Sequence, residues 1–289
     1  MPPATNHTLP HTLPLTLIVA TTPIRIASTL TPQDPNDSTR LGIGLKGTLP
    51  WPRIKADMNF FARVTSRPPV PGTTNAIIMG RKTYDSVPSH LRPLGKRISV
   101  VITRDQTGSV KKGVLKELEA RKEKLAAAAK AKAEKEAESE KVVAKEVIPE
   151  PITDAIVTPS LDAAISELDS VYGAKGQLGK IWVIGGAEIY GAALRMKFDE
   201  GERPVRIVMT NVVRKGAGSE ASFECDTFFP LDGMTEQDGW RRASSEEVSE
   251  WVGEEVKGEW KEEGMSRFRW LDSSGYIEGL DSKVADLYR

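Results

Sequence analysis

The sequence is poor in the side chains that most often bind metals or form disulfides: it has one cysteine, Cys225, and three histidines. A single cysteine cannot form an internal disulfide. The histidines, His7, His11 and His90, show no metal-ligand spacing with the cysteine or with one another. We therefore expect no metal site and no disulfide scaffold, and we expect a reduced, cytosolic setting.

Net charge of one sign and long apolar segments are also lacking. The 40 Lys and Arg residues balance the 40 Asp and Glu residues, so the charge gives no reason to expect a nucleic acid or a membrane surface as a partner. No apolar run reaches the roughly 18 residues of a membrane-spanning helix. Residues 1–14 have no basic segment before an apolar run, which predicts a disordered lead rather than a targeting peptide.

The chain does contain enough apolar sequence for a core, 39% of its 289 residues. Short β-branched runs predict buried strands at residues 15–20, 76–79, 98–103, 181–184 and 205–210. Helical patterns fall between these runs at residues 54–64, 161–168 and 187–196. This alternation predicts an α/β fold with a central, mostly parallel, twisted sheet flanked by helices.

The C-terminal part has a different pattern. Few helix signals follow Pro230, and in residues 266–270 core-type positions alternate with arginines. The alternation predicts a strand with one face on the core, and an antiparallel strand at the end of the sheet is the natural interpretation. We expect one domain over residues 15–271, followed by a tail at residues 272–289.

Two stretches have the composition of insertions. Residues 22–40 are rich in Thr, Pro, Asp, Asn and Ser, which predicts a long loop. Residues 111–147, within an insertion of about 105–153, are dominated by Lys, Glu and Ala, with opposite charges such as Glu117 and Arg121 at helical spacing. They predict a solvated helix with few apolar positions. A projecting helix without chemistry is favoured, and a docking site for a partner helix is the alternative.

Residues 42–47, GIGLKG, match the GxGxxG fingerprint of dinucleotide-binding turns. The run follows a polar stretch rather than a strand, and it leads into Leu49-Pro50-Trp51-Pro52 rather than opening a helix. We therefore reject a Rossmann-type turn at this place. The glycines are interpreted as letting the backbone turn closely around a ligand.

Asp57 is the candidate acid of the chain. A helix is expected to begin at Pro52, and projection at 100° per residue places Ile54, Met58 and Phe61 on one apolar stripe, with Asp57 on the same face. An acid in an early helical turn is ordinarily a dipole partner or a solvated cap. A partly buried carboxylate, however, has a raised pKa that suits proton transfer, so the pattern favours Asp57 as the group that handles protons.

Two segments join a buried strand to a glycine and a helix start, an arrangement suited to phosphate binding. Residues 76–83, AIIMGRKT, add basic and hydroxyl side chains, and residues 181–190, IWVIGGAEIY, add a glycine pair. Either turn alone is common in α/β proteins, but two in one chain predict a dinucleotide. Arg104, just after a predicted strand, is a candidate for the 2′-phosphate that distinguishes NADPH from NADH, with a plain surface arginine as the alternative.

Taken together, these motifs make the chain resemble the dihydrofolate reductase family. The matching motifs occur in family order, as Ile18-Val19-Ala20, Gly42-Ile43-Gly44, Leu49-Pro50-Trp51-Pro52, Met79-Gly80-Arg81-Lys82-Thr83, Arg92-Pro93-Leu94, Ile184-Gly185-Gly186 and Asp226-Thr227-Phe228-Phe229-Pro230. The resemblance implies a dihydrofolate-reductase-like α/β fold and NADPH-dependent reduction of 7,8-dihydrofolate to 5,6,7,8-tetrahydrofolate. It further implies hydride transfer to C6, protonation at N5, and a role in one-carbon metabolism and thymidylate synthesis.

The resemblance also implies roles for individual residues around the substrate. The catalytic group would be Asp57, with Thr210 hydrogen-bonded to the acid and Trp51 holding a nearby water. The walls around the pterin and the nicotinamide would be Ile18, Val19, Ala20, Ile184 and Tyr190. The aminobenzoyl ring would lie against Met58, Phe61, Val87 and Leu94, and the glutamate α-carboxylate would pair with Arg97.

For the cofactor, NADPH, the resemblance implies two phosphate turns and a 2′-phosphate site. The first turn would be Gly80, Arg81, Lys82 and Thr83. The second would be Gly185, Gly186, Ala187, Glu188 and Ile189, with a cis peptide between the two glycines. The 2′-phosphate would meet Thr103 and Arg104, and further cofactor contacts would come from Ala20, Ile43 and Gly44.

Two other classes of protein compete with this interpretation. A reductase of riboflavin synthesis shares the phosphate-binding pattern, but it is not expected to keep Leu49-Pro50-Trp51-Pro52 with an acid five residues beyond Pro52. A non-catalytic interaction protein that binds through the helix of residues 111–147 is disfavoured by the matches at every pocket position. We expect an active, monomeric enzyme that binds dihydrofolate and antifolate inhibitors.

Overall fold

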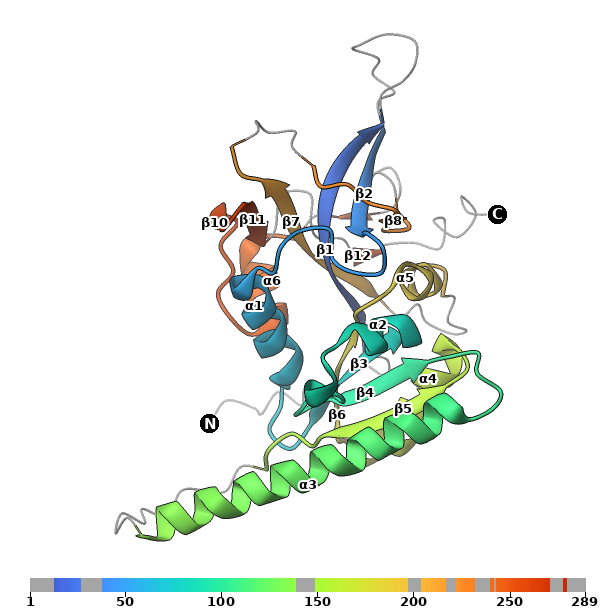
Figure 1. Ribbon diagram of the computed structural model, residues 1–289, viewed down its shortest axis with the longest axis vertical. Coiled ribbons are helices and arrows are strands. Elements are labelled where there is room, and N and C mark those ends of the chain that lie inside the picture. Colours follow the sequence, from blue (N-terminus) through green and yellow to red (C-terminus); the bar gives the residue numbers. More distant parts are fainter. Residues whose placement is uncertain are drawn as a thin grey trace, which may run out of the picture.

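A computed structural model of the chain describes residues 13–26, 38–138, 149–196, 204–216, 222–231, 240–241, 243–270 and 278–279. The strands of its main sheet path are β1 (Leu15–Ile26), β3 (Thr74–Gly80), β4 (Ile98–Ile102), β5 (Asp154–Thr158), β6 (Leu178–Val183), β7 (Val205–Arg214), β10 (Lys261–Glu263) and β11 (Ser266–Trp270). They are arranged in the order β10-β11-β7-β1-β6-β3-β4-β5 (Figure 1).

The strands from β7 to β5 all run parallel to their neighbours, whereas β11 pairs antiparallel with β7. The predicted fold class, a mostly parallel sheet with an antiparallel C-terminal strand, is therefore confirmed. Parallel strands end at a common edge, so the segments that follow β1, β3, β4 and β6 gather there. Open α/β sheets bind their ligands at this edge.

Helices cover both faces of the sheet because its central strands are apolar on both sides. In β3, Ala76 and Ile78 belong to one apolar cluster, and Ile77 and Met79 belong to the other. The first cluster includes residues of α4 (Leu161–Val171) and α5 (Ala187–Leu194). The second includes residues of α1 (Lys55–Ser66), α2 (Arg81–Ser86), α3 (Ser109–Glu138) and α6 (Ser245–Val252).

The remaining short elements are the 3-10 turns Ser89–Leu91 and Gly173–Lys175 and the strands β8 (Thr227–Phe228), β9 (Trp240–Arg241) and β12 (Glu278–Gly279).

The predicted loop at residues 22–40 is wrong at both of its ends. β1 continues to Ile26, and β2 (Ser38–Gly44) pairs with it antiparallel, from Ile26 opposite Ser38 to Thr22 opposite Gly42. The two strands form a long hairpin that extends beyond the neighbouring strands of the sheet, towards the top of Figure 1. Thr and Ile fit a pleated surface well, and pairing outweighs the turn signals of the neighbouring Pro and Ser residues. Residues 27–37 lie outside the described part of the chain.

Among the described residues one helix, α6, follows Pro230, where the sequence has few helix signals. Its first turn has a capping box: the Ser244 hydroxyl accepts a hydrogen bond from the Glu247 N–H at 3.2 Å, and the Glu247 carboxylate accepts one from the Ser244 N–H at 2.7 Å. Val248 and Val252, one turn apart, are buried in the second cluster. Strand β5 was likewise not predicted.

The predicted charged helix is present as α3, from Ser109 to Glu138, and residues 139–147 lie outside the described part. Val114 and Leu118 are buried one turn apart, whereas Leu115 and Leu125 are exposed. The first half of α3 lies along β5, and the second half projects beyond the sheet (Figure 1). The helix is therefore anchored by its first turns, as its sparse apolar positions indicate.

Candidate active site

Helix α1 places Asp57 inside the protein. Its buried residues include Asp57, Phe60 and Val64, which recur at helical spacing, and Asp57 is only 6% exposed. The predicted stripe of Ile54, Met58 and Phe61 is only partly right, because Ile54 is buried but Met58 and Phe61 are half-buried. The buried face is thus centred on the acid itself.

The N-terminus of α1 is capped by a residue more than 200 positions away in the sequence. Ile54, the residue before the helix, has no side-chain cap. Glu263, at the end of β10, accepts hydrogen bonds from the N–H of Lys55 at 2.7 Å and of Ala56 at 3.1 Å. These bonds lower the pKa of the Glu263 carboxyl below its usual value of 4.5. The β10–β11 hairpin therefore holds the start of the helix that carries Asp57.

We predict that Glu263→Ala lowers Tm by roughly 2–4 °C at neutral pH, because two helix N–H groups lose their acceptors. The folded-state pKa of Glu263 is depressed, so its stabilisation is complete above pH 4.5 and is lost as the pH falls through the lowered value. Thermal unfolding followed by circular dichroism at several pH values measures this. Glu262→Ala is the control, because Glu262 makes an exposed ion pair with Lys215. Equal Tm values for the two variants would disprove the cap.

Asp57 accepts two hydrogen bonds, both on Oδ1. The Thr210 hydroxyl donates one at 2.8 Å, and the indole Nε1–H of Trp270 donates the other at 3.1 Å. Thr210 in β7 and Trp270 in β11 face each other in the strand register. Burial raises the pKa of Asp57 above its ordinary value of 3.8, while the hydrogen bonds from Thr210 and Trp270 oppose this rise. The carboxyl group is therefore more readily protonated than a solvated one, as proton transfer requires.

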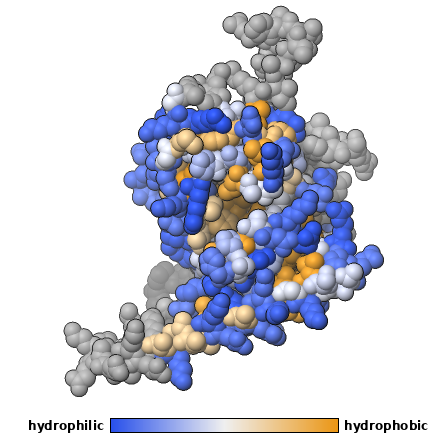
Figure 2. All heavy atoms as spheres, viewed as in Figure 1, coloured by the Kyte–Doolittle hydropathy of each residue, from blue (hydrophilic) through white to orange (hydrophobic). Residues whose placement is uncertain are grey.

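The acid opens onto a small hollow of about 270 Å³, lined by Thr48, Leu49, Trp51, Arg53, Ile54, Asp57 and Met58. A recess with apolar walls is visible near the middle of the face in Figure 2. Trp51 is 5% exposed and meets Phe223 edge-on at 6.1 Å. Its indole is not hydrogen-bonded to Asp57, since the direct indole donor is Trp270. The role of Trp51 through a water stays a prediction.

The other residues predicted to meet the substrate lie on elements around this recess. Ile18, Val19 and Ala20 lie in β1, and Ile184 follows β6. The Tyr190 hydroxyl, buried in α5, donates a hydrogen bond to the Ile18 carbonyl at 2.7 Å, which joins α5 to β1. The half-buried apolar residues Met58, Phe61, Val87 and Leu94 come from α1 and from the segments after α2 and before β4.

Arg97, the residue predicted to bind a carboxylate, is fixed just before β4. Its Nη1 donates to the Thr65 hydroxyl at 2.8 Å, and its Nε donates to the Gly95 carbonyl at 2.9 Å. Burial, together with the nearby charge of Arg121 from α3, lowers the pKa of Arg97 to about 10. Arg97 is therefore still cationic at neutral pH, and a carboxylate ligand would relieve its repulsion with Arg121.

The two glycine turns lie side by side, because β3 and β6 are neighbours in the sheet. The Gly80 N–H donates to the Gly185 carbonyl at 2.8 Å. The Gly185–Gly186 peptide is cis, as the resemblance implies. α2, with Arg81, Lys82 and Thr83, begins after the first turn, and α5, with Ala187, Glu188 and Ile189, begins after the second. Two helix N-termini thus converge at one edge of the sheet, a place suited to phosphate groups.

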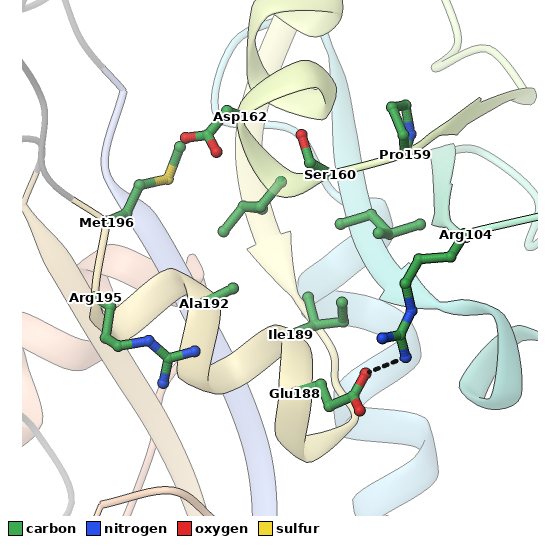
Figure 3. A pocket seen from close by; sticks show the side chains of 11 residues that line it. Arg104, Pro159, Ser160, Asp162, Glu188, Ile189, Ala192, Arg195 and Met196 are labelled. Atoms are coloured by element: carbon green, nitrogen blue, oxygen red, sulfur yellow. Dashed lines mark hydrogen bonds and ion pairs between the residues drawn. The ribbon is translucent and has the colours of Figure 1, made fainter.

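A larger cavity of about 400 Å³ lies beside α5. Its lining includes Arg104, Ser160, Asp162, Glu188 and Arg195 (Figure 3). Arg104 and Glu188 form an ion pair at 3.4 Å, and both side chains are more than 80% exposed. Thr103 follows β4 and donates its N–H to the Thr158 carbonyl. Of the two predicted 2′-phosphate residues, Arg104 therefore lines this cavity, together with Glu188 and Ile189 of the second glycine turn, whereas Thr103 is not among the lining residues.

The GxGxxG run does not open a helix, so the rejection of a Rossmann-type turn is correct. One reason for the rejection, that the run follows a polar stretch rather than a strand, is wrong, because Gly42 and Gly44 lie within strand β2. A Cβ on Gly42 would clash with Cys225 Sγ. At Gly42 the missing side chain thus makes room for Cys225 rather than for a ligand, and Ile43 beside it packs on the first apolar cluster.

Sequence reasoning missed Trp270 as a partner of the acid, along with Arg195, Ser160 and Asp162 in the larger cavity. The alternation of residues 266–270 put Trp270 on the core face, but no sequence signal places its N–H beside Asp57. For Ser160 and Asp162 a signal existed, because Ser160 caps α4 by accepting a hydrogen bond from the Ala163 N–H at 3.2 Å.

Nothing in the described ranges forms a group of three or more side chains suited to a metal ion. Among the helices that the structure describes, none has the length and apolarity needed to cross a bilayer.

Comparisons with known proteins agree with this architecture. The fold is similar to that of the dihydrofolate reductase of Schistosoma mansoni, which aligns over 93% of this chain and 99% of its own with a TM-score of 0.53 at 22% identity. The family profile for dihydrofolate reductase matches residues 36–144. The dihydrofolate reductase of Pneumocystis carinii is 30% identical over 237 residues, which span 79% of this chain and 88% of that protein. The dihydrofolate reductase of Gallus gallus is 32% identical over 192 residues, 66% of this chain and 72% of that protein.

The family match and the named relatives thus place this α/β protein among the oxidoreductases. The chain belongs to the dihydrofolate reductase family.

Proposed function

We propose that this protein reduces 7,8-dihydrofolate to 5,6,7,8-tetrahydrofolate with NADPH. The observation that carries the proposal is the buried Asp57, whose Oδ1 is held by two donors while the carboxyl group lines an apolar-walled hollow. Family membership supports the substrate. When bound, NADPH supplies the hydride that is transferred to C6.

The residues of the chain bind the substrate, orient it and hold a proton. Asp57 binds the N3 and 2-amino edge of the pterin and holds the proton that is destined for N5, because burial raises its pKa and so favours the protonated form. Arg97 binds the glutamate α-carboxylate with its fixed guanidinium. The apolar residues between these two ends hold the rings and exclude water, which strengthens both polar contacts.

The direct test is NADPH oxidation by the purified protein, followed by absorbance with and without dihydrofolate. We expect oxidation only with dihydrofolate and inhibition by a 2,4-diaminopyrimidine antifolate. A ribosylamino-pyrimidine substrate, as used in riboflavin synthesis, serves as the comparison. Turnover of that compound in place of dihydrofolate would contradict the proposed function.

The described residues fit a dinucleotide phosphate. At Gly80 and Gly185 the missing side chains make room for Ile189 and Tyr190, since a Cβ would lie 3.3 Å and 2.9 Å from them, so the two turns pack closely together. The helices α2 and α5 begin directly after these turns, and their N-termini offer N–H groups to an anion. Arg104 would hold the 2′-phosphate. Its present partner, Glu188, forms only an exposed ion pair with it, and such pairs contribute little, so a phosphate can displace the carboxylate.

We predict that Arg104→Ala raises KM for NADPH about 10- to 100-fold, because a charge-assisted hydrogen bond to the 2′-phosphate is lost. KM for NADH should change little, since NADH lacks that group. Steady-state kinetics with both cofactors measure the difference. Glu188→Gln is the matched control, because it removes the competing carboxylate and should leave NADPH binding equal or tighter. Equal losses for NADPH and NADH in the Arg104 variant would remove the 2′-phosphate assignment.

The monomeric state, the cytosolic location and the supply of tetrahydrofolate to thymidylate synthesis stay predictions from the sequence. Size-exclusion chromatography with light scattering tests the first of these.

A further inference from the structure

We propose that Trp270 is a positioning residue that holds Oδ1 of Asp57 through its indole N–H and thereby assigns the acid's proton to Oδ2. Trp270 lies at the end of β11, opposite Thr210 in β7, and both side chains donate to the same carboxylate oxygen, at 3.1 Å and 2.8 Å. Within the described part of the chain, Oδ2 accepts no hydrogen bond from the protein. The inference rests on the proposed function, because Oδ2 is the oxygen left for the substrate.

The indole ring is held in place by the residues around it. Phe60, one helical turn after Asp57 in α1, stacks on Trp270 with centroids 5.0 Å apart and an interplanar angle of 27°. Phe268 meets the ring edge-on at 5.5 Å, and Lys261 Nζ lies 4.2 Å from the ring centroid. Trp270 is 9% exposed. The indole N–H therefore has little freedom to leave Asp57.

The chemistry of the two donors is different. A threonine hydroxyl can donate or accept a hydrogen bond, so Thr210 can adapt to either protonation state of Asp57. An indole N–H can only donate. While Trp270 points at Oδ1, a proton on that oxygen would face the indole hydrogen, so the proton binds Oδ2 instead. Trp270 thus makes the two oxygens unequal and keeps the exchangeable proton on the substrate side.

The charged side chains near Asp57 and Trp270 do not hold the Asp57 carboxylate. Arg53 lines the hollow, Lys55 lies in the first turn of α1, Lys261 lies over the indole ring, and Arg269 precedes Trp270 in β11 and lies over the Trp260 ring. Among the described residues, none forms an ion pair with Asp57. The hydrogen bonds of Thr210 and Trp270 are therefore the specific contacts that favour the ionised form against burial.

The test is the Trp270→Phe variant, which keeps an aromatic ring against Phe60 and removes the N–H. Titration of the Asp57 carboxyl carbon by NMR, in protein labelled with ¹³C at aspartate and assigned with the Asp57→Asn variant, needs no substrate. We expect the midpoint to rise by about one pH unit, because the carboxylate loses a donor. Trp182→Phe is the matched control: Trp182 is 1% exposed and packs in the same cluster, but its Nε1 has no hydrogen-bond partner in the described structure. Its midpoint should equal that of wild type.

A second variant separates the N–H from the packing of the ring. Benzothienylalanine at position 270 keeps the bicyclic shape, replaces the N–H by sulfur, and should give the same upward shift with the fold retained. The pH at which reductase turnover falls should move upward in parallel. An unchanged midpoint in both variants overturns the inference even if the enzyme reduces dihydrofolate normally. If the midpoint shifts but the wild-type protein fails to reduce dihydrofolate, the proposed function is contradicted, whereas the role of the Trp270 hydrogen bond is supported.

Discussion

Replacing Asp57 by asparagine is expected to lower kcat for dihydrofolate reduction about 10²- to 10⁴-fold at neutral pH. Asparagine keeps an oxygen that can accept from Thr210 and Trp270, so the geometry around the site is retained. It has no exchangeable carboxylic proton, so proton delivery to the substrate is lost. Stopped-flow measurement of NADPH oxidation under saturating dihydrofolate checks the effect on the chemical step.

The pH dependence distinguishes loss of the proton from loss of the fold. Wild-type turnover should fall as the pH rises through the raised pKa of Asp57, because the protonated form is the active one, whereas the variant should show no such fall. The surface substitution Asp169→Asn in α4 serves as the control and should retain the wild-type profile. A variant with near wild-type turnover at pH 7 would exclude Asp57 from proton transfer.

The Asp57→Asn substitution should keep or raise the stability of the fold, although it lowers the activity. The folded-state pKa of Asp57 lies above its unfolded value of 3.8, so its contribution to stability is complete below that pH and is lost as the pH rises through the folded-state value. At neutral pH, ionisation of the buried carboxyl opposes folding, and asparagine removes this cost. Asp57→Asn should therefore unfold at an equal or higher Tm at pH 7, which shows that lost activity does not come from unfolding.

Local sequence patterns predicted the sheet well because its central strands are buried on both faces. Runs such as residues 76–79 and 98–103 are continuous and β-branched, and a strand covered on both sides needs such a run. β5 has only Ala155, Ile156 and Val157 as an apolar run between prolines, which is too short to stand out. Residues 22–26 carry turn-like composition, and only their pairing with β2 makes them a strand.

The residues of the candidate site likewise fall into two groups, those that local sequence patterns predict and those that depend on long-range pairing. Asp57 was found from its place on an apolar helix face, and the glycine turns were found from the strand–glycine–helix pattern. Their partners depend on long-range pairing: Thr210 is 153 residues from Asp57 and Trp270 is 213 residues away. The resemblance supplied Thr210. It did not supply Trp270 or Glu263, whose contacts with α1 exist only after the β10–β11 hairpin joins the sheet beside β7.

The second large effect is expected at Gly185, which has a φ of +105°, a region that side-chain-bearing residues rarely adopt. A Cβ there would also lie 2.9 Å from Cε2 and 3.1 Å from the hydroxyl of Tyr190. Tyr190 cannot move away freely, because its hydroxyl bonds to the Ile18 carbonyl and its ring packs 5.2 Å from Phe229. Gly185→Ala must therefore strain the backbone and displace a buried ring together.

We predict that Gly185→Ala destabilises the protein by about 2–5 kcal/mol, from backbone strain and overpacking combined. This corresponds to a drop in Tm of roughly 5–15 °C for a domain of this size. NADPH binding should weaken in whatever folded protein remains, because a moved Gly185 carbonyl no longer accepts from Gly80 and the two turns separate. Thermal unfolding and cofactor titration by fluorescence measure the two effects.

Gly186→Ala tests whether crowding at Tyr190 is the cause. Gly186 has a φ of −76°, and a Cβ there would meet the Thr83 hydroxyl at an ordinary 3.7 Å. The Gly186→Ala substitution should therefore lower the free energy of unfolding by less than about 1 kcal/mol. Any loss of NADPH affinity in Gly186→Ala would then come from a methyl group placed where the phosphates approach. If both variants unfolded at the same temperature, crowding at Tyr190 would not explain the glycine at position 185.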